Sequence, residues 1–271
     1  MNSARRQENL TRMLRELQAF VRENSIPEKP SSRPRAEKIA GEMPLAHSSA
    51  GTNLSRICAS GRLFSPQMLH DEGLKTLADH AVERELGTAG FVFLYAAPFS
   101  FPNSGCGFLF SESLERRNKD LGSATPFDSG GLVDHIQRTS GEPAREFFLR
   151  HELPLPSHRD YLRPCLESLY EKPGHYIDGT GPRHDGPLAL TGGDVRRWVH
   201  EVRIPHQVDI RSPHLKAVFA PRRLALVNEV RSLLLWCDAE GFDVVIFDAD
   251  RDNDFSKLRS ACVRYCNQLL N

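Results

Sequence analysis

Three short stretches of the sequence hold side chains that can bind a polar ligand and act on it. His47 is followed by Ser48 and Ser49, and imidazole and hydroxyl groups both donate and accept hydrogen bonds. Tyr95 ends an apolar run, and its ring can stack on another aromatic ring. Glu201 supplies a carboxylate, which can stabilise positive charge that develops during a reaction. Each residue alone also has an ordinary interpretation, as a structural histidine, a core tyrosine and a charge at a sheet edge.

The apolar pattern predicts the elements that would position these side chains. Short apolar runs bounded by turn residues predict strands at 43–47, 91–95, 106–110, 199–204, 215–219 and 243–247. Apolar residues at helical spacing predict helices at 5–23, 51–60, 67–86, 142–151, 158–171, 223–239 and 254–270. The Gly- and Pro-rich residues 172–197 predict a long loop that ends shortly before Glu201.

The composition limits the classes of protein that fit. A chain of 271 residues with 39% hydrophobic content can bury the core of one large domain. The 35 Lys and Arg residues balance 35 Asp and Glu residues, so only a local basic patch would attract a polyanion. No apolar run approaches the ~20 residues of a membrane helix. The N-terminus lacks the features of a secretory signal, and the six scattered cysteines fit reduced core residues. We therefore expect a cytoplasmic protein without a membrane partner.

The stretch from His47 to Leu63 carries the most specific pattern. It reads His-Ser-Ser-Ala-Gly-Thr-Asn-Leu-Ser-Arg-Ile-Cys-Ala-Ser-Gly-Arg-Leu. It resembles the first NAD⁺-binding motif of the ADP-ribosyltransferase superfamily, in the His-Tyr-Glu branch of poly-ADP-ribose polymerases, diphtheria-type toxins and bacterial DNA-modifying toxins. RNA 2′-phosphotransferases share this motif. The resemblance implies that His47, Ser48, Ser49 and Asn53 bind NAD⁺, and Ser48 stands where glycine is usual in the family.

A second segment, at 91–101, continues the resemblance. It reads Phe-Val-Phe-Leu-Tyr-Ala-Ala-Pro-Phe-Ser-Phe. Its Tyr95 matches a tyrosine that stacks on the nicotinamide ring in this superfamily, and Phe99 follows as a further candidate NAD⁺ contact. The later Pro-Phe-Asp-Ser-Gly-Gly at 126–131 resembles a stretch in bacterial members, and there Asp128 either orients a ribose hydroxyl or holds a turn.

The third segment leads from the long loop into a strand at 190–205. The family places its catalytic glutamate at the start of such a strand, so the resemblance assigns that role to Glu201. The arginine-specific branch has an acid two residues before this glutamate. Val199 stands there in this chain, which argues against arginine as the acceptor.

The resemblance implies an α+β fold with split, mostly antiparallel β-sheets around an NAD⁺ cleft. We expect an N-terminal amphipathic helix at 1–24, a linker at 25–42 and the ADP-ribosyltransferase-like catalytic domain at 43–220. A C-terminal helix-strand-helix extension would follow at 221–271.

The implied function is an NAD⁺-dependent mono-ADP-ribosyltransferase, a glycosyltransferase with Glu201 and Tyr95 as catalytic residues. Its acceptor would be a macromolecule, either protein or nucleic acid, and its role that of a toxin or an antiviral, phage-defence effector. Two alternatives stay open. One is an NAD⁺ glycohydrolase or an RNA 2′-phosphotransferase, and the other is a catalytically degenerate NAD⁺-binding module that docks a partner.

Metal-binding patterns are weaker. Four acids, Asp248, Asp250, Asp252 and Asp254, follow a predicted strand and could bind Mg²⁺. Acids at a strand end that leads into a helix also fit a solvated turn with an N-cap, and we favour that interpretation. Cys262 and Cys266 have no second ligand pair nearby in sequence, so we predict no metal site.

Overall fold

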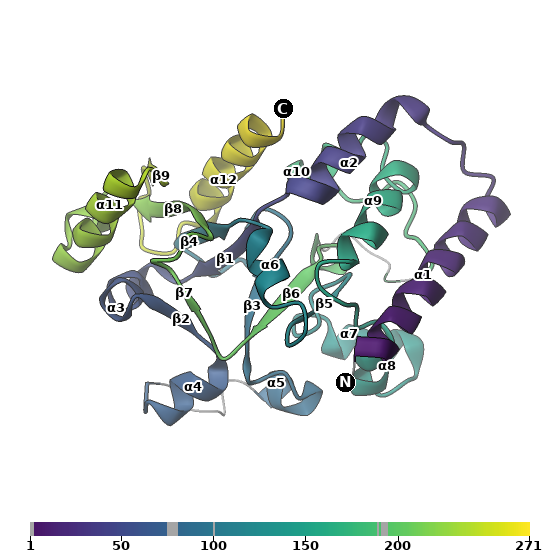
Figure 1. The fold of residues 1–271 in the computed structure, drawn as a ribbon, viewed down its shortest axis with the longest axis horizontal. Helices are drawn as coiled ribbons and strands as arrows, with labels where there is room; N and C mark the ends of the chain where they lie inside the picture. Colours follow the sequence, from purple (N-terminus) through teal and green to yellow (C-terminus); the bar gives the residue numbers. More distant parts are fainter. Residues whose placement is uncertain (1–2, 75–80, 100, 189, 191–194) are drawn as a thin grey trace.

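A mixed sheet crosses the molecule and carries most of the strands (Figure 1). The computed structural model describes residues 3–74, 81–99, 101–188, 190 and 195–271. The strands of this sheet are β1 (Leu45–Ser49), β3 (Phe91–Tyr95), β4 (Cys106–Phe110), β5 (Ser123–Thr125), β6 (Glu201–Pro205), β8 (Leu215–Pro221) and β9 (Asp243–Phe247). Their order is β5-β6-β3-β1-β4-β8-β9, and every neighbouring pair is antiparallel except β8 and β9.

The sheet narrows between β1 and β3. β1 pairs with β4 along its whole length, and β3 pairs with β6 along its whole length. Between β1 and β3, however, the register contains the single pair Ala46 and Tyr95. The sheet therefore consists of two mostly antiparallel halves, β5-β6-β3 and β1-β4-β8-β9, that diverge away from one joint. This is the α+β architecture with a split sheet that was expected.

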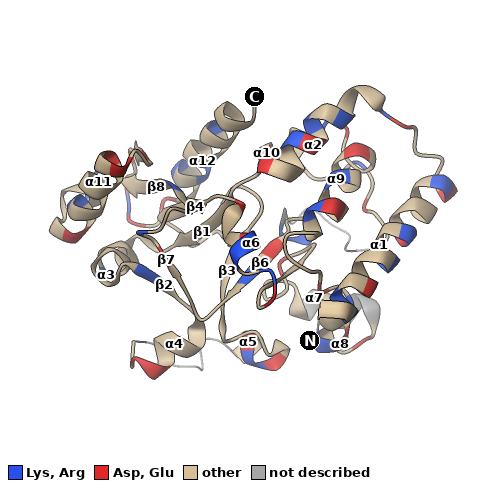
Figure 2. Ribbon diagram, in the orientation of Figure 1, with Lys and Arg blue, Asp and Glu red and all other residues tan. Residues whose placement is uncertain are grey.

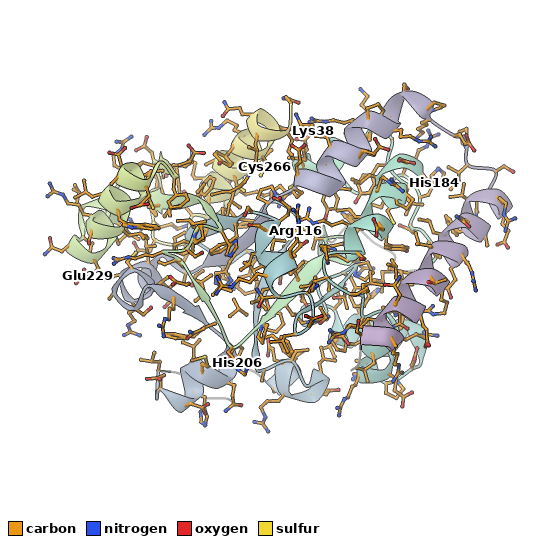
Figure 3. All side chains as sticks on the ribbon, viewed as in Figure 1. Lys38, Arg116, His184, His206, Glu229 and Cys266 are labelled. Atoms are coloured by element: carbon orange, nitrogen blue, oxygen red, sulfur yellow. The ribbon has the colours of Figure 1, made fainter. Side chains whose placement is uncertain are left out.

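A two-stranded sheet, β2 (Arg62–Phe64) with β7 (Gln207–Asp209), lies beside the larger one. β7 follows β6 directly, and His206 between them, labelled in Figure 3, has a φ of 62°. Its peptide N–H donates to the carbonyl of Gly90, and its carbonyl accepts from the N–H of Ser65. This tight turn carries the chain from one sheet into the other and fixes the far end of β6.

Helices cover both faces of the large sheet. They are α1 (Ser3–Glu23), α2 (Arg33–Glu42), α3 (Leu54–Ser60), α4 (Pro66–Asp71), α5 (Ala81–Leu86), α6 (Ser113–Arg117), α7 (Val133–Ser140), α8 (Ala144–Arg150), α9 (His158–Ser168), α10 (His175–Asp178), α11 (Asn228–Glu240) and α12 (Phe255–Leu270). Side chains alternate between the faces of a strand. In β4, Leu109 packs with residues of α1, α2, α9 and α12, whereas Phe108 and Phe110 pack with residues of α3 and α11. None of the described helices combines the length and apolar character that a membrane crossing requires.

The segment at 25–42 is not a linker along its whole length. After a short turn at Pro30–Ser32 it forms α2, whose Ala36, Ile39 and Ala40 are buried against the core. Pro34 lies in the first turn of α2, where a missing N–H breaks no helical hydrogen bond. The helix was not predicted because the segment is rich in prolines and charges, and its narrow apolar stripe consists mostly of small residues.

The structure also differs from the sequence prediction at 67–86, where one helix was expected. The structure has two short helices, α4 and α5, in this region, and residues 75–80 between them lie outside the described residues. Gly73, which follows α4, has a φ of 67°, a conformation that favours glycine.

The residues from 221 onward extend the same sheet. β9 adds a parallel strand to β8, and α12 packs across β8 and β9. Buried residues of α12, among them Leu258, Cys262 and Cys266, belong to the same apolar cluster as α1, α2 and α9. The helix-strand-helix unit therefore shares a core with the rest of the chain. Figure 2 shows acidic and basic residues interspersed along the outer helices, in keeping with the balanced charge.

Candidate active site

A cavity of about 680 Å³ opens where the two halves of the sheet diverge. Residues from β1, β3 and β6 line it together with loops that join the strands. The predicted site residues on its wall are His47, Ser48, Ser49, Asn53, Tyr95, Asp128 and Glu201. These side chains come from positions far apart in the sequence, and the split in the sheet brings them to one cavity.

Phe99 does not lie on this wall. Its side chain is buried, and its ring packs edge-on against Phe219. A Cβ atom on Gly107 would overlap the Phe99 ring, so the absence of a side chain at Gly107 lets the ring fill the core. The structure therefore places Phe99 in the hydrophobic core rather than at the cavity where a ligand contact was expected.

His47 lies at the joint between the two halves of the sheet. Its Nδ1 atom is 2.8 Å from the carbonyl oxygen of Phe93, and because a carbonyl only accepts, Nδ1 carries the proton. Burial lowers the pKa of His47 and outweighs this hydrogen bond, so the ring is neutral near pH 7. The neutral tautomer leaves Nε2 as a hydrogen-bond acceptor on a side chain that lines the cavity.

The two serines after His47 have different partners. The Ser49 hydroxyl accepts a hydrogen bond of 3.0 Å from the Asn53 side-chain amide, which ties the strand end to the following turn. The Ser48 hydroxyl accepts a hydrogen bond of 2.8 Å from the buried Ser104. This contact gives the side chain of Ser48, which stands where the resembled family usually has glycine, a polar partner of its own.

Tyr95 and Asp128 form a pair on the cavity wall. The Tyr95 hydroxyl is hydrogen-bonded to the Asp128 carboxylate. Burial and the negative charges of Asp128 and Glu201 raise the pKa of Tyr95 well above its usual value, so the phenol stays protonated. Asp128 also accepts a hydrogen bond of 2.7 Å from the N–H of Gly131, which holds the turn that was one of its two expected roles.

Glu201 begins β6 directly opposite Tyr95 in the strand register. It is 1% exposed, and three donors hold its carboxylate. The Ser129 hydroxyl donates to Oε1 at 2.7 Å, the Ser129 N–H donates to Oε2 at 3.1 Å, and Nη1 of Arg203 donates to Oε1 at 2.8 Å. These contacts fix both carboxylate oxygens at the cavity wall.

Glu201 has a proton affinity unlike that of an ordinary glutamate. Burial raises its pKa to about 7, the positive charge of Arg203 opposes this shift, and the charge of Asp128 adds to it. The hydrogen bonds from Ser129 favour the charged form. A carboxylate with a pKa near neutrality can accept a proton from a bound reactant, so the site can support general base catalysis.

Arg203 was not predicted as a site residue, although it is among the largest fully buried side chains. It donates to the hydroxyls of Ser123 and Thr125 on β5, and a second carboxylate, that of Glu152, lies 3.7 Å away. Its guanidinium also lies 4.4 Å from the centre of the Phe148 ring. Arg203 and Glu201 are two residues apart on one strand, and that spacing alone puts them on the same face.

A buried polar chain lies behind the start of β6. Nδ1 of His200 is 2.9 Å from Nδ1 of His158, whose Nε2 is 3.0 Å from Glu115. Arg159 makes two hydrogen bonds to the same carboxylate. Burial alone would raise the pKa of Glu115, but the charges and hydrogen bonds of His158 and Arg159 lower it to about 2. This network ties α6, α9 and the residue before Glu201 together.

Three of the four acids that follow β9 have a partner within the chain, and for Asp252 this partner is Arg223, at 2.6 Å. Asp248 pairs with Arg222 at 2.7 Å, and the Asp254 side chain caps α12. Among the described residues there is no group of three or more His, Cys, Asp or Glu side chains that could hold a metal ion. Residues 191–194 of the third sequence segment lie outside the described residues. From this segment, the site described above therefore uses residues 195–201, and the other strands supply the rest.

Comparison with known proteins gives a distant structural likeness. The chain is similar to Thermus sp. 2.9 DarT in complex with ADP-ribosylated ssDNA, at 12% identity and a TM-score of 0.42, over 82% of this chain and 97% of that chain. It is also similar to Thermus sp. 2.9 DarT in complex with NAD⁺, at 10% identity and a TM-score of 0.40, over 75% and 94% of the two chains. No protein-family model matches the chain, and no curated protein matches it. The residue roles that we propose rest on the geometry of this chain.

Proposed function

We propose that this protein is an NAD⁺-dependent ADP-ribosyltransferase in which Glu201 is the catalytic carboxylate. One observation carries the proposal: a neutral imidazole, a tyrosine ring and a buried carboxylate of raised pKa come from β1, β3 and β6 to the wall of one cavity. Titratable groups with shifted pKa values in a cavity are typical of active sites.

The cavity suits a dinucleotide in size and lining. Its volume of about 680 Å³ falls within the roughly 300–1,000 Å³ of small-molecule sites. Nε2 of His47 would accept a hydrogen bond from a ribose hydroxyl, and the ring of Tyr95 would stack on the nicotinamide. Such stacking contributes about 0.5–1.5 kcal/mol beyond the burial of area. NAD⁺ is therefore the substrate whose groups best match these side chains.

The reaction would break the bond between the nicotinamide nitrogen and the ribose anomeric carbon, and the bonding electron pair would leave with nicotinamide. Positive charge then grows on the sugar, as it does in glycoside hydrolysis. The Glu201 carboxylate stabilises that charge, because it is already oriented by Ser129 and Arg203. An acceptor nucleophile bonds to the anomeric carbon, and its proton passes to Glu201.

We propose a nucleic acid as the acceptor. Arg56 and Arg62 are exposed side chains on the cavity wall, and Phe101, which also lines the cavity, is 46% exposed. Arginines beside an exposed aromatic ring are the groups that bind single-stranded nucleic acid, through its phosphates and through base stacking. An activity of this kind would act in the cytoplasm as a toxin or a phage-defence effector.

The test incubates the protein with NAD⁺ labelled on its adenylate portion and with ssDNA, duplex DNA, RNA or a mixture of proteins. Label attached to ssDNA supports the proposal, whereas label on protein moves the acceptor to another class. Free ADP-ribose identifies an NAD⁺ glycohydrolase. Thermal protection by NAD⁺ without any product identifies a binding module. Loss of a 2′-phosphate from RNA identifies the phosphotransferase. Growth arrest by the wild-type chain, absent with Glu201→Gln, would support the toxin role.

His47→Ala is expected to weaken NAD⁺ binding by about 5- to 10-fold, because the loss of one hydrogen bond costs about 1 kcal/mol. Isothermal titration calorimetry measures this change. His184→Ala is the matched control, since His184 is a partly buried histidine that does not line the cavity, labelled in Figure 3. An affinity of His47→Ala equal to that of the control would contradict the role of His47.

The pH dependence follows from Glu201. Its pKa of about 7 in the free protein means that the protonated, inactive form predominates below that pH and the carboxylate above it. We expect kcat/KM to rise with pH through an apparent pKa near 7, which reports the free enzyme. A profile that is flat across this range, with NAD⁺ binding unchanged, would exclude Glu201 as the group that titrates.

A further inference from the structure

The loop between β9 and α12 packs against the turn that follows His47. Oδ1 of Asn253 accepts a hydrogen bond of 2.9 Å from the N–H of Gly51. A Cβ atom on Gly51 or on Gly105 would overlap the backbone carbonyl of Asp252. The loop thus touches the backbone on both sides of the turn, and only glycine at these two positions leaves room for it.

Residues of the C-terminal unit hold this loop in place. Asp252 forms an ion pair of 2.6 Å with Arg223, and the Asp254 side chain accepts from the N–H of Lys257 at the start of α12. One turn further along α12, Arg259 donates to the carbonyl of Phe99 at 2.8 Å. The position of Asn253 is therefore set by contacts on either side of it along the chain.

The turn that Asn253 contacts belongs to the candidate NAD⁺ site. Ser49, Ala50 and Asn53 line the cavity, and Gly51 begins the short helical turn that ends at Asn53, directly before α3. The carbonyl of Ser49 accepts a hydrogen bond of 2.8 Å from the N–H of Gly105. The turn is consequently held on one side by Gly105, the residue before β4, and on the other by a side chain 202 residues later in the sequence.

We propose that Asn253 is a positioning residue of the NAD⁺ site, which it serves by holding the Gly51 amide and so the turn from Ser49 to Asn53. This inference rests on the proposed function. Asn253 does not line the cavity, so its effect is on ligand binding rather than on the chemical step. The C-terminal unit is then part of the binding site through one hydrogen bond and two close backbone contacts.

The test compares Asn253→Ala with Asn253→Asp, which keeps an acceptor oxygen at the same position. Asp250→Ala is the control, because Asp250 is an exposed residue of the same loop. We expect Asn253→Ala to raise KM for NAD⁺ by about 5- to 10-fold with kcat within about twofold of wild type. Asn253→Asp and the control should keep KM within about twofold of wild type.

Amide hydrogen exchange at Gly51 provides a readout that needs no ligand. In Asn253→Ala this amide should exchange faster than in wild type, while it keeps its protection in Asn253→Asp. An unchanged KM and unchanged exchange in Asn253→Ala would overturn the proposal, as would a fall in kcat at constant KM. If Asn253→Ala does not fold, the stable variant Asn253→Asp decides instead. A wild-type KM for NAD⁺ in Asn253→Asp supports the proposal, and a raised KM overturns it. If wild-type protein neither binds nor converts NAD⁺, the proposed function fails, and the exchange at Gly51 still decides whether Asn253 holds the turn.

Discussion

Glu201→Gln should lower ADP-ribosyl transfer by at least about 10²- to 10³-fold while NAD⁺ binds with nearly unchanged affinity. Glutamine keeps the shape of the side chain and an oxygen that can accept from Ser129 and Arg203, but it removes the negative charge. That charge is needed when positive charge grows on the ribose, and it contributes little before the bond begins to break. The loss should therefore fall on kcat.

Initial rates with labelled NAD⁺ and calorimetric affinities measure the two quantities separately. Glu240→Gln is a suitable control, since Glu240 is an exposed residue at the end of α11. The control should retain wild-type rates. Turnover by Glu201→Gln at more than about a tenth of the wild-type rate would remove Glu201 from the catalytic role, because one electrostatic contact of this kind contributes far more.

Arg203→Gln should destabilise the fold by about 3–5 kcal/mol, the cost of breaking a buried ion pair by removing one partner. Arg203 is buried between two carboxylates, with Glu201 at 2.8 Å and Glu152 at 3.7 Å. Without its positive charge, these acids face each other in a site of low polarity. The pKa of Glu201 should then rise further, because Arg203 is the group that lowers it most.

Denaturant unfolding at pH 7 measures the stability change, and the pH profile of kcat/KM measures the shift of Glu201. Arg203→Lys separates charge from geometry, since lysine keeps the positive charge but cannot bridge Ser123, Thr125 and Glu201 at once. The lysine variant should recover part of the stability. A free energy of unfolding for Arg203→Gln within about 1 kcal/mol of wild type would mean that the buried pair contributes little.

Much of the sheet could be predicted from local pattern. β3, β4 and β9 have the bounds that the sequence predicted, since each is an apolar run between turn residues. β5 was missed because its Ser-Ala-Thr sequence has no apolar run. Its buried position depends on pairing with β6, which is a property of the folded sheet. α2 was missed because it buries only two alanines and one isoleucine, which is a weak apolar pattern among prolines and charged residues.

The candidate site, too, was predicted only in part: the sequence led to some of its residues, and others depend on contacts in the folded chain. The motif resemblance led to His47, Tyr95 and Glu201, and all three line the cavity. It did not lead to Arg203 or to Ser129, since the partners of a buried carboxylate depend on which strands lie beside it. Phe99 was misplaced because an aromatic residue next to a site in sequence can equally face the core. The close contact of its ring with Gly107 decides between these orientations only in three dimensions.

The parallel pairing of β8 with β9 has a consequence for synthesis of the chain. Translation delivers the N-terminal part first, and domains begin to fold as they emerge. A chain that still lacks residues 243–271 leaves β8 without its neighbour and the Gly51 N–H without the Asn253 oxygen. The turn that follows His47 is thus fastened by a side chain that is translated 202 residues after Gly51, so a product that stops before Asn253 would lack this support.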